Sequence, residues 1–163
     1  MQGLLHFLAR GYVRMTLESL CRLVAVDEIL DLRHRLLRAG LPFEAARFDH
    51  DMDETTRHYA AFQRDRLVCC LTLLESVWQS RPAWQLRGMA TELDMQGTGV
   101  GRTLVQFATA DVRPAAPERI FWCNARTSAQ GFYARLGWTV ESEPFDIPHA
   151  GPHVKMQWLP DGV

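Results

Sequence analysis

Residues 96–102, with the sequence Gln-Gly-Thr-Gly-Val-Gly-Arg, are the part of this chain best suited to binding an anion. They lie between an expected strand and an expected helix. Glycines let the backbone turn tightly and approach a ligand without an intervening Cβ. The first amides of a helix have no internal partners and lie at its positive end, where a phosphate or pyrophosphate binds well. The turn therefore predicts a phosphate-bearing ligand, and a turn with no ligand is the alternative.

The glycine spacing separates this turn from two common phosphate-binding motifs. It is G-x-G-x-G rather than the G-x-G-x-x-G of dinucleotide-binding folds, and no Gly-Lys-Ser/Thr follows as it would in a P-loop. The turn alone therefore predicts a class of ligand and not one particular ligand.

A second segment, residues 124–138, has polar side chains where a strand gives way to a helix. Asn124 ends the expected strand. Ala129 and Tyr133 lie four residues apart, on one face of the expected helix. A small residue beside a phenol lets a ligand lie against that face. The alternative for Tyr133 is an ordinary helix residue whose hydroxyl binds water.

Together these segments resemble the GNAT superfamily of acyl-CoA-dependent N-acetyltransferases. The family's pyrophosphate motif, Gln/Arg-x-x-Gly-x-Gly/Ala, is matched by Gln96, Gly99 and Gly101. Residues 129–138, with Phe-Tyr followed by Leu-Gly-Trp, are similar to the family's second CoA-contacting helix and its ending. The two motifs occur in the family's order, and the resemblance spans about residues 18–159.

The resemblance implies a single α/β (α+β) domain over residues 15–163, with residues 1–14 as an N-terminal extension. Its sheet would be mixed and mostly antiparallel, with about seven strands, a splayed central strand at residues 88–91 and three to four flanking helices. The implied activity is transfer of an acetyl group from acetyl-CoA to a primary amine by direct attack. A non-catalytic acyl-CoA-binding or sensing module and an unrelated nucleotide-using enzyme are the alternatives.

The resemblance also implies roles for individual residues. Backbone groups of Met89 and Thr91 would bind the pantetheine arm as an added strand would, and an amide near Met89 would stabilise the oxyanion. Asn124 would contact the pantetheine or the adenosine side. Tyr133 would donate a proton to the departing thiolate. The implied cofactor-contacting residues are Met89, Ala90, Thr91, Gln96, Gly97, Thr98, Gly99, Val100, Gly101, Arg102, Asn124, Ala129 and Tyr133.

A general base is needed because an ammonium must lose a proton before its nitrogen can attack. Glu75, at the end of an expected strand, Glu92, beside the glycine-rich turn, and His153 are the candidates. A structural role for His153 and deprotonation by water are the alternatives. The candidate catalytic residues are Tyr133, His153 and Glu75.

Charge is distributed unevenly along the chain. Residues 95–140 hold five arginines against two acidic residues, a positive region suited to a polyanion, and Arg102 and Arg126 are the best candidates for phosphate contact. Residues 44–54 hold five acidic residues against one arginine. If this run lines the acceptor groove it favours a cationic amine; a solvated loop is the alternative. It lacks the glycine and terminal glutamate of a calcium loop, so no metal site is expected.

The composition is that of an ordinary folded domain, with 47% hydrophobic residues. Eighteen basic residues against nineteen acidic ones argue against a nucleic-acid partner. No apolar run approaches the roughly 18 residues of a membrane span, so we expect a soluble protein with no membrane association. The four cysteines form no C-x-x-C pair and are expected to be thiols of a reducing compartment, which predicts a cytoplasmic location. A homodimer is compatible with these features.

Strand-like and helix-like segments alternate along the chain and position the motifs. Residues 43–57 are polar and expected to be irregular, and residues 63–66 predict the turn of a hairpin. The expected helices run from Asp27 to Gly40, from Gly99 to Pro114, and from Thr127 or Ser128 to Leu136. The expected strands cover residues 20–25, 58–62, 67–74, 83–90, 119–123, 138–141 and 153–159.

Overall fold

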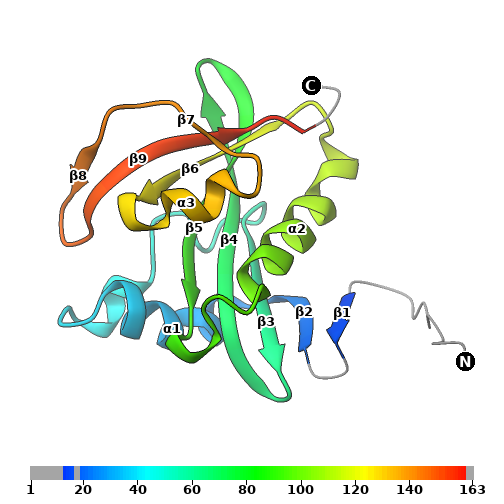
Figure 1. Cartoon of the computed structure of the whole chain (residues 1–163), viewed down its shortest axis with the longest axis vertical. Helices are drawn as coiled ribbons and strands as arrows, with labels where there is room; N and C mark the ends of the chain where they lie inside the picture. Colours follow the sequence, from blue (N-terminus) through cyan, green and yellow to red (C-terminus); the bar gives the residue numbers. More distant parts are fainter. Residues whose placement is uncertain (1–12, 17–18, 161–163) are drawn as a thin grey trace, which may run out of the picture.

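A computed structural model describes residues 13–16 and 19–160, so most of the expected N-terminal extension lies outside the described residues (Figure 1). The helices are α1 (Val26–Leu37), α2 (Val100–Val112) and α3 (Gln130–Ala134), with short 3₁₀ turns at Phe43–Ala46, Leu93–Met95, Arg113–Ala115 and Thr127–Ala129. The strands are β1 (Val13–Thr16), β2 (Ser19–Val24), β3 (Arg57–Gln63), β4 (Arg66–Trp78), β5 (Arg81–Thr91), β6 (Ile120–Arg126), β7 (Thr139–Val140), β8 (Phe145–Ile147) and β9 (Gly151–Trp158).

The strands form one mixed sheet in the order β1-β2-β3-β4-β5-β6-β9-β7, and β8 pairs with β9. Every neighbouring pair is antiparallel except β5 and β6, which are parallel. The predicted single mixed, mostly antiparallel domain is therefore confirmed, with nine strands in the described part rather than about seven. The additional strands are β1 and β8. The sequence of β8 lies between Pro144 and Pro148, which favour a turn, so pattern alone does not reveal it.

Helices α1 and α2 cover opposite faces of the sheet. Leu104 of α2 belongs to the larger core cluster with Cys69, whereas Ile29 and Leu32 of α1 pack with Cys70. Adjacent residues of a strand point to opposite faces, which explains why these neighbouring cysteines enter different clusters. Helix α3 packs on the same side as α2, because its Tyr133 belongs to the larger cluster.

The first helix begins two residues earlier than the predicted cap at Asp27 indicates. The N-cap is Ala25 rather than Asp27, and α1 starts at Val26. The Glu28 carboxylate accepts a hydrogen bond from the Ala25 N–H at 2.9 Å. That bond satisfies one of the amides that a capping side chain normally serves. Asp27 instead pairs with Arg47 at 2.5 Å.

Strand β6 continues past its predicted end at Cys123. It pairs with β9 as far as Arg126, which lies opposite His153. Asn124 and Arg126 are therefore strand residues. No side-chain cap follows at Thr127 or Ser128; a 3₁₀ turn over Thr127–Ala129 leads directly into α3.

Candidate active site

Strands β5 and β6 lie side by side over only part of their length. Their parallel ladder ends with Leu86 opposite Cys123. Beyond that point β5 stays paired with β4 as far as Thr91, and β6 stays paired with β9 as far as Arg126. The sheet therefore opens between the last residues of the two strands, which leaves the β6 side of β5 without a ladder partner among the described residues. This is the splayed central strand that the family resemblance implies.

A bulge in β5 lies where the sheet opens. Three steps along β5, from Arg87 to Ala90, match only two steps along β4, so Gly88 and Met89 lie opposite a single residue. Gly88 has φ +59°, in the left-handed region that favours glycine. A bulge leaves one residue out of the ladder and changes the direction of neighbouring groups. A main-chain amide is therefore free of the ladder at this point.

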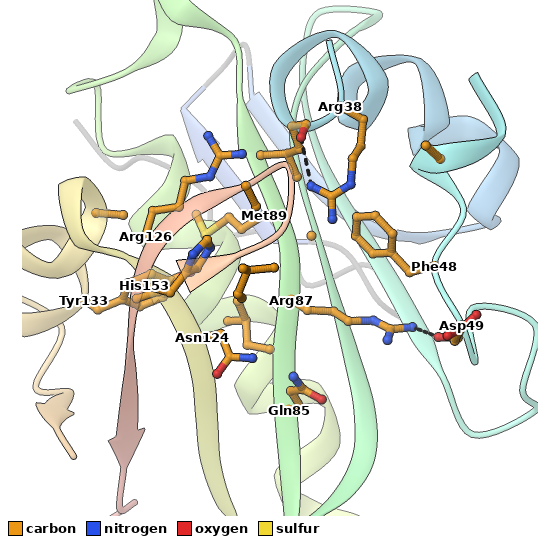
Figure 2. A pocket seen from close by; sticks show the side chains of 18 of the residues that line it. Arg38, Phe48, Asp49, Gln85, Arg87, Met89, Asn124, Arg126, Tyr133 and His153 are labelled. Carbon is orange, nitrogen blue, oxygen red and sulfur yellow. Dashed lines mark hydrogen bonds between the residues drawn. The ribbon is translucent and has the colours of Figure 1, made fainter. Parts of the chain in front are cut away.

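A cavity of about 500 Å³ lies at this opening (Figure 2). It is lined by the later residues of β5 and β6, the beginning of the α3 segment, the end of α1 with the loop that follows it, and the hairpin between β8 and β9. Of the predicted site residues, six line it: Met89, Asn124, Arg126, Ala129, Tyr133 and His153. Arg126, a predicted phosphate contact, therefore lies in this cavity rather than at the glycine-rich turn.

The Tyr133 hydroxyl keeps its proton in this environment. The side chain is buried, and its oxygen lies 3.5 Å from Sδ of Met89 on the bulge. Burial raises the pKa of Tyr133 well above its ordinary value, and the neighbouring Cys123 and Cys69 raise it further. A thioether sulfur is a weak acceptor, so the hydroxyl can turn its hydrogen toward a better acceptor on a ligand. The phenol can thus act as a proton donor beside the bulge.

His153 brings an imidazole to the same cavity from β9. Its Nδ1 lies 2.7 Å from the main-chain oxygen of Gly151. A carbonyl only accepts hydrogen bonds, so Nδ1 carries the hydrogen, which in the neutral ring leaves the lone pair on Nε2. Nε2 has no hydrogen-bond partner among the described residues. His153 can therefore accept a proton at Nε2.

Asn124 has an unused acceptor at the edge of the cavity. Its Oδ1 is buried and has no hydrogen-bond partner among the described residues. Buried acceptors without a partner are rare, so this oxygen fits a ligand that donates an N–H. An amide of a pantetheine arm is such a donor. Ala129 follows on the adjoining turn and lines the cavity without obstructing it.

Two predicted candidates for the general base lie outside the cavity lining. Glu75 is half exposed and pairs with Arg119 at 2.9 Å. Glu92 pairs with Arg35 of α1 at 2.7 Å. The structure therefore brings His153 to Tyr133 and does not bring either glutamate there.

The glycine-rich turn lies apart from the cavity, at the beginning of α2. Gly99 is the N-cap with φ +90°, and a Cβ built there would meet nothing within 4 Å. At Gly101 a Cβ would lie 3.0 Å from Cε of Met89, so this glycine lets the helix pack closely on β5. The Gln96 side chain donates to the main-chain oxygen of Thr91 at 3.3 Å. The turn is thus open to solvent and tied to the end of β5.

The other residues predicted to contact the ligand near this turn could do so through main-chain groups or lie at the protein surface. Ala90 and Val100 have buried side chains, so only their main-chain groups could meet a ligand. Arg102 is exposed and lines a second hollow of about 220 Å³ with Arg135. Arg102, in the first turn of α2, adds positive charge that suits a polyanion.

The acidic run at residues 44–54 does not form an acidic wall. Asp51 is buried and pairs with Arg33 at 2.6 Å and with Arg87 at 3.0 Å. Burial raises the pKa of Asp51, but the Arg33 guanidinium, the Phe48 N–H and Arg87 outweigh it and hold that pKa below its ordinary value. Of the carboxylates in this run, only that of Asp49 lines the cavity.

The sequence reasoning did not single out Arg38, Phe48 or Arg87, which also line the cavity. The signal for Arg87 was its position one residue before a glycine in an otherwise apolar strand. Arg38 and Phe48 lie on either side of the segment 39–47, and no local pattern brings them to β5.

The four cysteines take no part in this arrangement. All are buried free thiols, and none lines the cavity. Burial raises the pKa of Cys21 to about 11 and that of Cys70 to about 12. Thiolate is the nucleophilic form, so these side chains are poor nucleophiles.

Within the described ranges, no group of three or more histidine, cysteine, aspartate or glutamate side chains could hold a metal ion. None of the helices described is both long and apolar enough to cross a bilayer.

The sequence model of the acetyltransferase (GNAT) domain matches residues 41–160. The chain belongs to this family. The uncharacterized N-acetyltransferase YitI of Bacillus subtilis is 33% identical over 139 residues, which cover 82% of this chain and 91% of that protein. This relative matches most of both chains, so the likeness extends across the domain.

Solved structures of other proteins superpose on this one. ElaA of Escherichia coli superposes with a TM-score of 0.69 and 19% identity, covering 84% of this chain and 97% of ElaA. An aminoglycoside 6′-N-acetyltransferase complexed with coenzyme A superposes with a TM-score of 0.64 and 15% identity, covering 85% of this chain and 93% of that one. At these identities the superpositions show that this GNAT chain shares the fold.

Proposed function

We propose that this GNAT protein transfers an acetyl group from acetyl-CoA to a primary amine by direct attack. One observation carries the proposal: the sheet opens at the β5 bulge, and the proton-bearing hydroxyl of Tyr133 contacts Met89 there at 3.5 Å. The site thus combines a free main-chain amide, a proton donor and a cavity for a second substrate.

Residues of this site suit both the diphosphate and the pantetheine arm of acetyl-CoA. The exposed turn at residues 96–102 offers helix amides to the diphosphate, and Arg102 adds positive charge. The unpaired edge of β5 suits a pantetheine arm that hydrogen-bonds as a strand would. Oδ1 of Asn124 supplies an acceptor for one of its amides. The aminoglycoside 6′-N-acetyltransferase that shares this fold was solved with coenzyme A.

The chemistry then follows from the side chains at the opening. His153 Nε2 would take the proton of the acceptor ammonium, which frees the nitrogen lone pair for attack on the thioester carbonyl. The free amide of the bulge would donate to the carbonyl oxygen as negative charge develops there. As the carbon–sulfur bond breaks, Tyr133 would give its proton to the sulfur, so that the products are an amide and a thiol.

Direct attack is preferred over an acyl-enzyme route because the thiols are unsuited to it. Cys69 and Cys123 are buried, and burial raises the pKa of both well above the ordinary value. A thiol that stays protonated and lies outside the cavity cannot hold the acetyl group efficiently.

Two measurements on the purified protein test the proposal. Calorimetry with acetyl-CoA should show a single site, and a broad amine panel should give amine-dependent release of free thiol. Binding without thiol release from any amine would instead favour an acyl-CoA-binding or sensing module. Absence of acetyl-CoA binding would overturn the proposal altogether.

A further inference from the structure

The cavity has a surplus of positive charge. Four arginines line it, at positions 38, 47, 87 and 126, and Asp49 is the one carboxylate among the residues that line it. Two of these arginines each have a carboxylate partner. Arg47 pairs with Asp27 at 2.5 Å, and Arg87 pairs with Asp51 at 3.0 Å.

The other two arginines have no carboxylate partner in the described part of the chain. Arg38 donates to the main-chain oxygen of Leu37 at 2.9 Å, which leaves its charge uncompensated. The side chain of Arg126 forms no ion pair or hydrogen bond among the described residues. Figure 2 shows both side chains extending into the cavity around Met89, one from the end of α1 and one from the end of β6.

The Arg38 guanidinium packs against an aromatic ring. It lies over the ring of Phe48, 4.8 Å from the ring centroid. Burial lowers the pKa of Arg38, and the charges of Arg126 and Arg33 lower it further. Arg126 lines the same cavity, so the two positive charges face one ligand-sized space. Two like charges kept together without a carboxylate between them indicate that an anion belongs there.

We propose that the acceptor amine carries a carboxylate, as an amino acid does, and that Arg38 and Arg126 bind this carboxylate together. The proposal rests on the proposed acetyl transfer and adds the class of its acceptor. Guanidinium groups bind carboxylates through paired N–H donors, so two of them fix both the position and the orientation of the acceptor. The amino group of the acceptor would then reach the bulge at Met89 beside His153.

The diphosphate of the donor is the other anion to consider, and its expected place is elsewhere. Residues 96–102 do not line this cavity, and Arg102 belongs to a different hollow. The cavity is instead bordered by the loop after α1 and by the β8–β9 hairpin, including Ile147. Because residues 96–102 line neither this cavity nor its border, we assign the arginine pair to the acceptor.

The test compares acceptors that differ in one charge. A panel of α- and β-amino acids, each with its carboxamide, is assayed for thiol release with the wild type and with Arg38→Gln, Arg126→Gln and Arg81→Gln. Arg81 is an exposed arginine at the beginning of β5, outside the cavity, and serves as the matched control. Calorimetry measures the Kd of acetyl-CoA, and also that of the N-acetylated products and their carboxamides in the presence of CoA.

We expect the wild type to prefer the best carboxylate over its carboxamide by about ten-fold or more in kcat/KM, because a site built for a charged group rejects an analogue without it. Arg38→Gln and Arg126→Gln should abolish that preference and leave the Kd of acetyl-CoA within about two-fold of its original value. Arg81→Gln should keep the preference. The acetylated product should bind better than its carboxamide to the wild type and to Arg81→Gln, and no better than its carboxamide to the two cavity variants.

Three results would overturn the proposal: equal use of both acceptor classes by the wild type, weaker acetyl-CoA binding in both cavity variants, or neither turnover nor product binding for any carboxylate. The third result, together with acetylation of uncharged amines, would leave the proposed function standing. Product binding does not require turnover, so it reports on the arginine pair even if no amine releases thiol.

Discussion

Arg33 of α1 lies against the main chain of Gly88, so that a Cβ at position 88 would fall 2.8 Å from Arg33 Nε. Arg33 is fully buried and also donates to Asp51, to Thr72 and to the main-chain oxygen of Ala46. One side chain therefore joins the bulge, the loop after α1 and strand β4. The geometry of the opening depends on this network.

Replacing Gly88 with alanine should strongly destabilise the protein. The residue has φ +59°, and the added Cβ meets the buried Arg33, so backbone strain and overpacking together should lower the free energy of unfolding by about 3 kcal/mol. The control is Gly40→Ala. Gly40 has φ +82° and nothing within 4 Å of the added Cβ, so it should lose only about 1 kcal/mol. Urea unfolding of both variants measures the difference; equal losses would show that contact with Arg33 is unimportant.

His58 should make the protein less stable as the pH falls below about 6.5, the ordinary pKa of histidine. Nε2 of His58 lies 2.9 Å from the main-chain oxygen of Asp51, and Nδ1 lies 2.8 Å from Oγ1 of Thr72. The carbonyl requires a hydrogen on Nε2, so Nδ1 accepts from the Thr72 hydroxyl, and a second proton would break that bond. Burial lowers the pKa of His58, although the bond to Asp51 opposes this, and the Arg33 charge lowers it further.

A group whose pKa is lower in the folded state stabilises the protein above its unfolded pKa and loses that contribution as the pH falls through the folded value. Unfolding free energies measured between pH 7.5 and 5 should therefore decline in the wild type and decline less steeply in His58→Gln. An NMR pH titration of the His58 ring measures its pKa and checks that this residue takes up the proton. Identical slopes for the two proteins would exclude His58 as the cause.

Local patterns were enough to predict the elements that carry the candidate site. The hairpin of β3 and β4 turns at Arg64 and Asp65 within the predicted residues 63–66, and α2 begins after the glycine-rich turn. Tyr133 and Ala129 both line the cavity, as their predicted spacing of four residues indicates. These features depend on periodicity, turn residues and glycines, all of which are local.

Features that depend on strand register could not be predicted in the same way. The split between β5 and β6 follows from where their ladder ends, and the position of Glu75 follows from its pairing with Arg119. Burial of Arg33 had one local signal, since it lies four residues after Ile29 on the apolar side of α1. Its partner Asp51 lies in an acidic run, and only the folded chain shows that this carboxylate is internal.

A carboxylate at position 99 should prevent the donor from binding. Gly99→Glu places negative charge at the N-cap of α2, where the diphosphate is proposed to lie, so the Kd of acetyl-CoA should rise by about 100-fold, equivalent to about 2.7 kcal/mol. Gly99→Ala introduces the same backbone strain at φ +90° without the charge and should bind more tightly than the glutamate variant. Calorimetry compares the two; equal affinities would attribute any loss to strain rather than to the diphosphate.

Replacing Tyr133 with phenylalanine should slow turnover without weakening the donor complex. The change removes the proton donor beside Met89 and keeps the ring in its buried position, so kcat should fall by about 100-fold while the Kd of acetyl-CoA stays within about two-fold. Tyr59→Phe is the matched control, because its hydroxyl donates to Asp111 at 2.7 Å and does not line the cavity. That variant should lose stability and retain its kcat. Steady-state thiol release, with calorimetry for binding, measures both; an unchanged kcat in Tyr133→Phe would remove this hydroxyl from the proton-transfer step.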